Sequence, residues 1–351
     1  MEKKKLKVLL ISPEFSVKET KGLARYSLEL YQRIKNFVEV RTIFRKKFHK
    51  GILGFLYSLF YSNFLVFLEG RKYDVIHAIS PELSFTASLF YKKKTITTFH
   101  DLFPILYWKD LKLKMGFFVH ILSYFIWKIA SRSKIIVANS SLTEEQIRKV
   151  FNRKSYIILE GIDREKFKKT REKNDNLTLC FVGNYSYRKR VDIAIKLYRK
   201  LKEEISCKLI IVGGKLKSVY YTNFDLSSIK DENIIILDKV SDKELLDVYS
   251  QSHFLIFPSI TEGFGLPILE ALSCDTLSIT FKFSEIPKEV KELSIECIDL
   301  EDAKNKILNL WKDKKGYMKM LKKFKKKLRK FDWNKAAKQY LNLYKKILLY
   351  E

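Results

Sequence analysis

Proline and glycine are scarce in this 351-residue sequence, which holds 6 and 12 of them respectively. Since these two residues mark most turns and chain breaks, each cluster of glycine is an informative local signal. The sequence also has no low-complexity stretch and no internal repeat. Hydrophobic residues make up 46% of the chain, and a chain of this length suits two α/β domains better than one.

Cysteine is scarce as well, and the cysteines form no Cys-x-x-Cys pair. The four are Cys180, Cys207, Cys274 and Cys297. Most of them stand in or beside apolar runs, as buried reduced thiols do, so we expect a reducing, cytoplasmic compartment. The basic N-terminus leads directly into the apolar residues 8–11, a run too short for the core of a signal peptide.

Long hydrophobic runs are also missing. Residues 51–68 and 115–127 carry no charge, but a membrane-spanning helix needs about 20 mostly apolar residues. The first segment is interrupted by polar residues and the second is too short, so we predict no transmembrane helix. Two interpretations remain for these aromatic-rich segments. They fit helices packed on a sheet, and they also fit helices on an anionic membrane, because lysines and arginines flank them.

Acidic residues are too few to balance the basic ones, and the net charge is +28 at pH 7. About +18 of this charge falls within residues 1–170. The asymmetry suggests a polyanionic partner, such as nucleic acid, anionic lipid headgroups or a phosphorylated acceptor, although a lysine-rich proteome would also produce it. Because no nucleic-acid-binding module is recognisable, we expect an anionic membrane surface and no nucleic acid as partner.

Strand-like apolar runs alternate with helical patterns along the whole chain. The expected strands are residues 7–11, 38–44, 74–78, 95–99, 134–138 and 155–159, and then 177–182, 208–212, 233–237, 254–257 and 276–280. Strands separated by helices predict parallel sheets with right-handed crossovers. The predicted fold class is α/β, with two facing, doubly wound, Rossmann-like domains. Such sheets bind ligands at the carboxyl ends of their strands, here in a cleft between the domains.

The domain boundaries follow from composition. Residues 161–176 are polar and charged, so we predict a first domain over residues 1–165 and a second over 166–332. Residues 333–351 read as an amphipathic helix that crosses back to the first domain. Ser141 and Glu144 predict a capping box that opens a helix. The lysine-dense residues 312–330 predict one further helix.

A glycine-rich turn follows the expected strand over residues 254–257. Pro267 stands where the first turn of a helix would begin. The turn would present the backbone amides of Gly263, Phe264, Gly265 and Leu266. Unpaired N–H groups and the helix dipole both favour a phosphate there. Glu262 before the turn and Glu270 within the helix add carboxylates that accept hydrogen bonds from sugar hydroxyls.

A second glycine turn follows the expected strand over residues 177–182. It begins with Gly183 and Asn184 and continues to Arg188 and Lys189. The motif is expected to open a helix, where cations oppose the positive end of the helix dipole, and a bound pyrophosphate would remove that conflict. A solvated basic turn is the alternative interpretation.

Two weaker signals lie in the first half. His100 stands at the carboxyl end of an expected strand, where a doubly wound sheet presents functional groups. Gly22 follows the first strand and would allow its backbone to approach a phosphate. The other histidines are interpreted as structural, although His77 also ends a strand.

In this order and spacing, the four motifs resemble the retaining glycosyltransferase family 4, the glycosyl transferases group 1, whose members have the GT-B fold. The similarity covers nearly the whole chain and includes residues 74–77, 138–141 and 160–163. The sequence departs from the family pattern at Lys21, in the N-terminal loop, and at Asp238, before the base pocket.

The resemblance implies roles around the diphosphate. Arg188 and Lys189, in the loop of Gly183 and Asn184, are expected to hold the diphosphate and stabilise it as the leaving group. Gly22 is expected to bring the N-terminal loop close to the donor phosphate.

The resemblance also implies roles around the sugar and the base. Glu270 is expected to bind the ribose hydroxyls, and Glu262 to contact the donor sugar beside the amides of the glycine turn. His100 is expected near the reacting face of the sugar, and Val240 near the base.

The implied activity is retaining transfer of a sugar from a UDP- or GDP-linked donor to a hydroxyl of a membrane-associated glycan or lipid-linked acceptor. The enzyme would then be peripheral on the cytoplasmic face of the cell membrane. An Asp-x-Asp motif is lacking, so we expect no metal ion and no other cofactor. The alternatives are the same chemistry on a soluble acceptor, and a basic membrane- or nucleic-acid-binding protein on this scaffold without transferase activity.

Overall fold

The computed structural model describes residues 5–13, 22–45, 52–107, 117–214 and 229–349. The chain divides into two compact units. The first comprises Met1–Leu106, Gly116–Gly161 and Phe331–Glu351, and the second comprises Tyr107–Met115 and Ile162–Lys330. The passage from the first unit to the second at residues 161–162 lies four residues before the boundary expected from composition.

The first unit contains a parallel six-stranded sheet in the order β2-β1-β3-β4-β5-β6. Its strands are β1 (Lys7–Pro13), β2 (Glu39–Arg45), β3 (Val75–Ala78), β4 (Thr95–Phe99), β5 (Ile135–Ala138) and β6 (Tyr156–Ile157). Its helices are α1 (Leu23–Ile34), α2 (Ile52–Glu69), α3 (Phe85–Phe90), α4 (Phe103–Leu106), α5 (Phe117–Ala130), α6 (Ser141–Phe151) and α13 (Trp333–Leu348).

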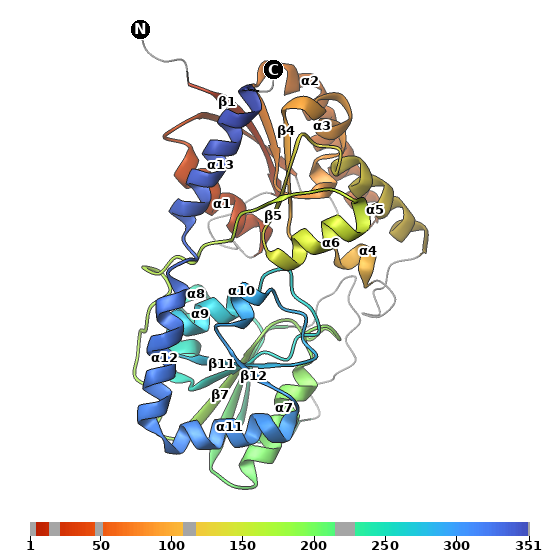
Figure 1. Ribbon diagram of the computed structural model, residues 1–351. Helices are drawn as coiled ribbons and strands as arrows, with labels where there is room; N and C mark the ends of the chain where they lie inside the picture. Colours follow the sequence, from red (N-terminus) through yellow and green to blue (C-terminus); the bar gives the residue numbers. More distant parts are fainter. Residues whose placement is uncertain (1–4, 14–21, 46–51, 108–116, 215–228, 350–351) are drawn as a thin grey trace. The chain divides into compact units, whose positions relative to one another are not determined.

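The side chains of β1 point alternately to the two faces of the sheet, which explains the helical layers of this unit. Val8 and Leu10 pack into a cluster with residues of α1 and α13, which lie side by side on one face of the sheet (Figure 1). Leu9 and Ile11 pack on the opposite face with residues of α2 and α3. Successive side chains of a strand point to opposite faces, so one uniformly apolar strand serves two helical layers.

The last helix belongs to the first unit because its tyrosines complete a buried polar network there. The Tyr344 hydroxyl lies 2.8 Å from Nδ1 of His77, and Nε2 of His77 lies 2.9 Å from the Thr98 hydroxyl. The Tyr340 hydroxyl lies 3.0 Å from the same threonine oxygen. Burial lowers the pKa of His77 to about 3, so this histidine is a neutral structural group.

The second unit contains a parallel six-stranded sheet in the order β12-β11-β10-β7-β8-β9. Its strands are β7 (Leu177–Val182), β8 (Cys207–Val212), β9 (Ile234–Leu237), β10 (Phe254–Ile256), β11 (Leu277–Phe281) and β12 (Ile295–Cys297). Its helices are α7 (Val191–Lys202), α8 (Asp242–Gln251), α9 (Leu266–Ser273), α10 (Lys288–Lys291), α11 (Leu300–Lys312) and α12 (Lys314–Leu328). The two parallel sheets confirm the predicted fold class.

Two helix boundaries differ from the sequence prediction. The cap of α6 is Ser140, whose side chain accepts a hydrogen bond from the Thr143 amide, so Ser141 is already helical. The lysine-dense segment forms the end of α11 and all of α12, because Asp313 breaks the pattern and caps α12 through the Gly316 amide. In both cases a short polar side chain satisfies free amides at the start of the helix, and for α6 that residue stands one position before the expected Ser141.

The two uncharged segments form α2 and α5. None of the helices in the described part of the chain is both long and apolar enough to cross a membrane. The flanking basic residues 46–50 and 109–114 lie outside the described residues. Helix α2 buries Ser62 and Val66 but exposes Phe60, Phe64 and Phe67, so one face packs on the unit and the other meets solvent.

Candidate functional site

The two glycine motifs of the second unit meet at one point of its sheet. β7 and β10 are neighbours although two strands separate them in the sequence. The loop after β7 starts at Gly183, and the loop after β10 starts at Phe257. This reversal of strand order is the place where doubly wound sheets bind ligands, beyond the carboxyl ends of the strands.

Backbone and side-chain hydrogen bonds join the two loops. The Ile260 amide donates to the Arg188 carbonyl oxygen at 2.8 Å. The Arg188 guanidinium donates to the Thr261 carbonyl oxygen at 2.7 Å. The loops therefore form one rigid surface rather than two independent turns.

A buried ion triad lies where the loops meet. The Glu262 carboxylate lies 2.9 Å from the Arg188 guanidinium and 2.6 Å from the Lys189 ammonium, and all three residues are at least nine-tenths buried. Burial alone would raise the pKa of Glu262, but the two cations outweigh it and lower the pKa to about 2. One carboxylate shared by two cations leaves positive charge at the strand ends, which suits a diphosphate.

The triad corrects one expectation. Arg188 and Lys189 do not open a helix, because α7 begins only at Val191, after Arg190 in the left-handed conformation. Glu262 compensates part of their charge, and because they stand outside the helix no phosphate is required to relieve a conflict with the helix dipole. Both carboxylate oxygens of Glu262 contact these cations here, which differs from the donor-sugar contact that the resemblance implies.

The glycine-rich turn after β10 leads into α9 as expected. Gly265 stands at the start of α9 with φ of 106°, a backbone conformation that residues other than glycine rarely adopt. Pro267 follows in the first turn of the helix. Helix α9 has no side-chain cap. The N-terminus of α9 can therefore direct backbone amides, together with those of Gly263, Phe264 and Leu266, toward an anion.

Glu270 lies in α9, one turn beyond the glycine turn. Its side chain is buried, and its Oε2 accepts a hydrogen bond from the Tyr249 hydroxyl at 3.0 Å. Burial and the nearby carboxylate raise the pKa of Tyr249 well above its ordinary value, so the phenol stays protonated and holds the carboxylate in place. The sequence did not single out Tyr249, because nothing local distinguishes it from an ordinary core tyrosine.

Two further glycines shape the same edge of the sheet. Gly213 follows β8 with φ of 138°, and a side chain there would overlap the Gly183 carbonyl oxygen. A side chain at Gly214 would overlap the Asp238 carboxylate, which follows β9. Two consecutive glycines directly after an expected strand are the sequence feature from which this close packing could have been predicted. Val240 lies just before α8, partly buried.

Among the described residues, no group of three histidine, cysteine, aspartate or glutamate side chains is arranged to hold a metal ion.

His100 lies in the first unit, directly after β4. Its Nε2 is 2.9 Å from the Ile79 carbonyl oxygen, and its Nδ1 is 3.3 Å from the Glu160 carboxylate. The same carboxylate oxygen accepts a hydrogen bond from the Asn139 side chain at 2.8 Å. The Tyr26 ring packs at a right angle against the imidazole, with ring centroids 4.6 Å apart. The ring orientation of His100 is therefore fixed, and sequence reasoning missed Asn139 and Glu160 as the residues that fix it.

Gly22 starts α1 with φ of 58°, and the space around it is open. A substitution there would strain the backbone but would meet no neighbour within 4 Å. Its expected approach to a phosphate stays a prediction, since residues 14–21, with Lys21, lie outside the described residues.

Two family models match consecutive parts of the chain. The model of glycosyl transferases group 1 matches residues 162–331, and the model of Glycosyltransferase Family 4 matches residues 2–166. The chain belongs to glycosyltransferase family 4. The predicted resemblance is confirmed, and the protein is a glycosyltransferase.

Individual proteins agree with this membership. The chain is 30% identical over 202 residues to the O-antigen chain mannosyltransferase RfbU of Salmonella typhimurium. The match covers 56% of this chain and 53% of RfbU, so it spans about half the length of that relative. It is similar in fold to sucrose-phosphate synthase from Thermosynechococcus elongatus (15% identity, TM-score 0.77, covering 99% and 100% of the two chains). A structure of Anabaena HepE in complex with UDP and glucose is also similar (15% identity, TM-score 0.71, covering 96% and 99%). The fold is thus GT-B.

Proposed function

We propose that this family 4 enzyme transfers a sugar from a UDP- or GDP-linked donor to a hydroxyl of a membrane-associated glycan or lipid-linked acceptor. The observation that carries the donor part is the buried triad of Arg188, Lys189 and Glu262 beside the uncapped N-terminus of α9. Fixed cations and backbone amides at one point provide preorganised stabilisation for a departing diphosphate.

The residue roles follow from that arrangement. Arg188 and Lys189 bind the diphosphate, with the turn of Gly183 and Asn184 allowing its close approach. Glu262 keeps both cations in position, and the remaining lone pairs of its carboxylate oxygens accept hydrogen bonds from the donor sugar. Glu270, held by Tyr249 at 3.0 Å, accepts hydrogen bonds from the ribose hydroxyls.

The proposed reaction retains the configuration of the sugar and uses no metal ion. The bond between the anomeric carbon and the diphosphate oxygen breaks, and the acceptor hydroxyl oxygen bonds to that carbon on the same face. The hydroxyl proton passes to the departing phosphate oxygen. Negative charge grows on that phosphate as the bond breaks, so Arg188 and Lys189 stabilise the transition state more than the bound donor.

The acceptor proposal rests on relatives and on one surface. RfbU is named as an O-antigen chain mannosyltransferase, and a galactosyltransferase of the lipopolysaccharide outer core is similar in fold, with a TM-score of 0.67 at 13% identity. On the first unit, α2 exposes Phe60, Phe64 and Phe67, and Phe90 of α3 packs against Phe67 with ring centroids 5.1 Å apart. Exposed aromatic side chains grouped on adjacent helices suit the interface of a membrane.

The donor assignment is tested by titrating the protein with UDP, GDP and a short oligonucleotide, followed by a panel of nucleotide sugars assayed for hydrolysis and transfer. We expect one nucleoside diphosphate to bind, and Glu270→Ala to weaken that binding by about 1–3 kcal/mol because the ribose loses its acceptor. Unchanged affinity in the folded variant would contradict the ribose role. Preference for the oligonucleotide would favour a binding protein without transferase activity.

The metal-free chemistry is tested separately. Transfer should continue at the same rate in excess EDTA, because cationic side chains and helix amides supply the stabilisation. Loss of transfer in EDTA that Mn²⁺ or Mg²⁺ restores would exclude the metal-free mechanism while leaving the donor assignment intact.

A further inference from the structure

The second unit has a basic hollow away from the donor site, with a volume of about 600 Å³. It is lined by Arg164, Phe167, Lys168, Ser273, Lys322, Lys325, Lys326, Leu328 and Arg329. Most of these residues belong to α12 and its C-terminal end. Ser273 ends α9, the helix whose first residues form the glycine turn, so about 12 Å of helix separates the hollow from that turn.

The charge in this hollow has one sign. Six of its nine lining residues are lysine or arginine, and none is acidic. Lys325 forms an ion pair with Asp275. The side chains of Lys168, Lys322 and Lys326 make no ion pair or hydrogen bond with any residue in the described ranges. Several uncompensated cations around one hollow repel one another, so an anion placed among them would be bound favourably.

A lysine-rich composition alone does not explain the arrangement. Other lysines of this unit lie beside carboxylates: Lys327 and Lys330 contact Glu292, and Lys304 contacts Glu204 at 2.7 Å. Helix α12 thus carries Lys327, which is paired, and Lys322 and Lys326, which form no ion pair and line the hollow.

The uncharged walls give the hollow a defined shape. Phe167 and Leu328 are buried and form an apolar base against which lysine stems can lie. The buried Ser273 hydroxyl has no hydrogen-bond partner among the described residues. A polar group left unsatisfied at the wall of a basic hollow is a further indication of a ligand.

We propose that this hollow binds a phosphate-bearing anion. A phosphate offers several oxygen acceptors and up to two negative charges, which matches clustered ammonium and guanidinium donors. The proposal goes beyond glycosyl transfer and does not rest on it. Two sources supply this chemistry, a phospholipid headgroup and a free phosphate ester, and the experiment below separates them.

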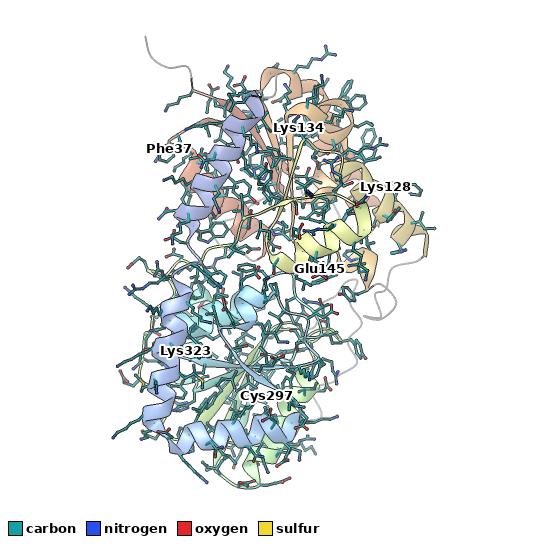
Figure 2. The ribbon with its side chains drawn as sticks, viewed as in Figure 1. Phe37, Lys128, Lys134, Glu145, Cys297 and Lys323 are labelled. Atoms are coloured by element: carbon teal, nitrogen blue, oxygen red, sulfur yellow. The ribbon has the colours of Figure 1, made fainter. Side chains whose placement is uncertain are left out.

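The test compares two double variants with the same loss of charge. Lys322→Gln with Lys326→Gln removes two cations of the hollow. Lys319→Gln with Lys323→Gln removes two exposed cations from the same helix that do not line it; Lys323 is labelled in Figure 2. Each protein is sedimented with phosphatidylcholine vesicles, with and without phosphatidylglycerol, and titrated with inorganic phosphate, pyrophosphate and glycerol phosphate.

We expect the first pair to weaken binding of one probe by roughly 10- to 30-fold, and the second pair to have a much smaller effect. A selective loss on phosphatidylglycerol vesicles assigns the hollow to a lipid headgroup, and a selective loss for a soluble phosphate assigns it to a free ester. Equal losses in both pairs, or no loss in either, would overturn the proposal. Unchanged UDP or GDP affinity and unchanged thermal unfolding verify that the variants are folded.

Discussion

At the scale of residues, a single carboxylate connects the two loops that we propose to bind the donor. Glu262 contacts both Arg188 and Lys189, from which it is separated by more than 70 residues in the sequence. Removing one partner of a buried ion pair leaves an uncompensated charge, which costs more than the pair contributed. Glu262 therefore stabilises the fold as well as shaping the site.

This role predicts a dependence on pH. The pKa of Glu262 is about 2 in the folded chain, below its ordinary value of 4.5. A depressed pKa contributes stability that is complete above about pH 4.5 and is lost as the pH falls toward 2. Glu262→Gln removes this contribution, so we expect stability about 3–5 kcal/mol lower at neutral pH, with a shallower decline on acidification. Urea denaturation across a pH series measures both effects.

The control for Glu262 is Glu301→Gln. Glu301 also lies beside lysines, at 2.6 Å from Lys304, but on the exposed surface. Solvent screens exposed pairs, so this change should leave stability nearly unaltered. Parallel pH profiles for Glu262→Gln and the unaltered protein would refute the stabilising role of the triad.

Glu160 provides a prediction for the first unit. Its carboxylate lies 3.3 Å from Nδ1 of His100 and accepts from Asn139 at 2.8 Å. Glu160→Gln should lower turnover by roughly 10- to 100-fold. Without the carboxylate the His100 ring would shift, and a small displacement of a group near the reacting sugar disturbs the reactive geometry. The affinity for UDP or GDP should stay nearly the same, because most of the residues proposed to bind the nucleotide lie in the second unit. A proportional fall in nucleotide affinity would instead indicate a general structural defect.

Sequence patterns identified the site motifs but not their contacts. The position of Gly265 before Pro267 predicted an uncapped helix N-terminus, because both residues have strong local preferences. The contact of Glu262 with Arg188 and Lys189 depends on β7 and β10 being neighbours, which no local pattern encodes. From the sequence alone, Arg188 and Lys189 are therefore expected to oppose a helix dipole, and a bound phosphate is the only visible group that would offset their charge.

Secondary structure elements were predictable where apolar periodicity was strong. The expected strands over residues 95–99 and 177–182 coincide with β4 and β7, whose side chains are almost all buried. β12 was missed because it is a three-residue edge strand with the exposed Glu296 at its centre. Three residues are too few to distinguish a strand by its periodicity.

Helix α13 gives a prediction at the element scale. The Tyr344 hydroxyl lies 2.8 Å from Nδ1 of the fully buried His77. Tyr344→Phe keeps the ring but leaves that nitrogen unsatisfied, so we expect stability to fall by about 1–3 kcal/mol in urea denaturation. Tyr156→Phe, whose hydroxyl interacts with Lys346 at the surface, is the matched control and should change little. Similar effects of the two changes would argue against the buried network as the anchor of α13.

The two units carry different surface chemistry at the scale of the whole molecule. The second unit has the two glycine motifs of the proposed donor site at one edge of its sheet, and a basic hollow beside α12. The first unit exposes aromatic side chains on α2 and α3, and Phe125 on α5 is also exposed. Because exposed phenylalanines rarely gather on adjacent helices without a partner, the first unit is the one that we expect to contact a membrane.

This expectation is testable with vesicles. Phe60→Ser combined with Phe64→Ser removes two exposed rings from one face of α2. The control is Phe37→Ser, which removes a ring that is 66% exposed elsewhere on the same unit; Phe37 is labelled in Figure 2. Each ring that inserts would contribute about 1–2 kcal/mol, so the double variant should sediment with phosphatidylglycerol vesicles at least roughly tenfold more weakly, while Phe37→Ser should not. Basic residues add a salt-sensitive component, which should disappear near 1 M salt, where the Debye length is about 3 Å. If vesicle binding does not depend on anionic lipid, or if the double variant binds as strongly as the unaltered protein, a soluble acceptor would instead be favoured.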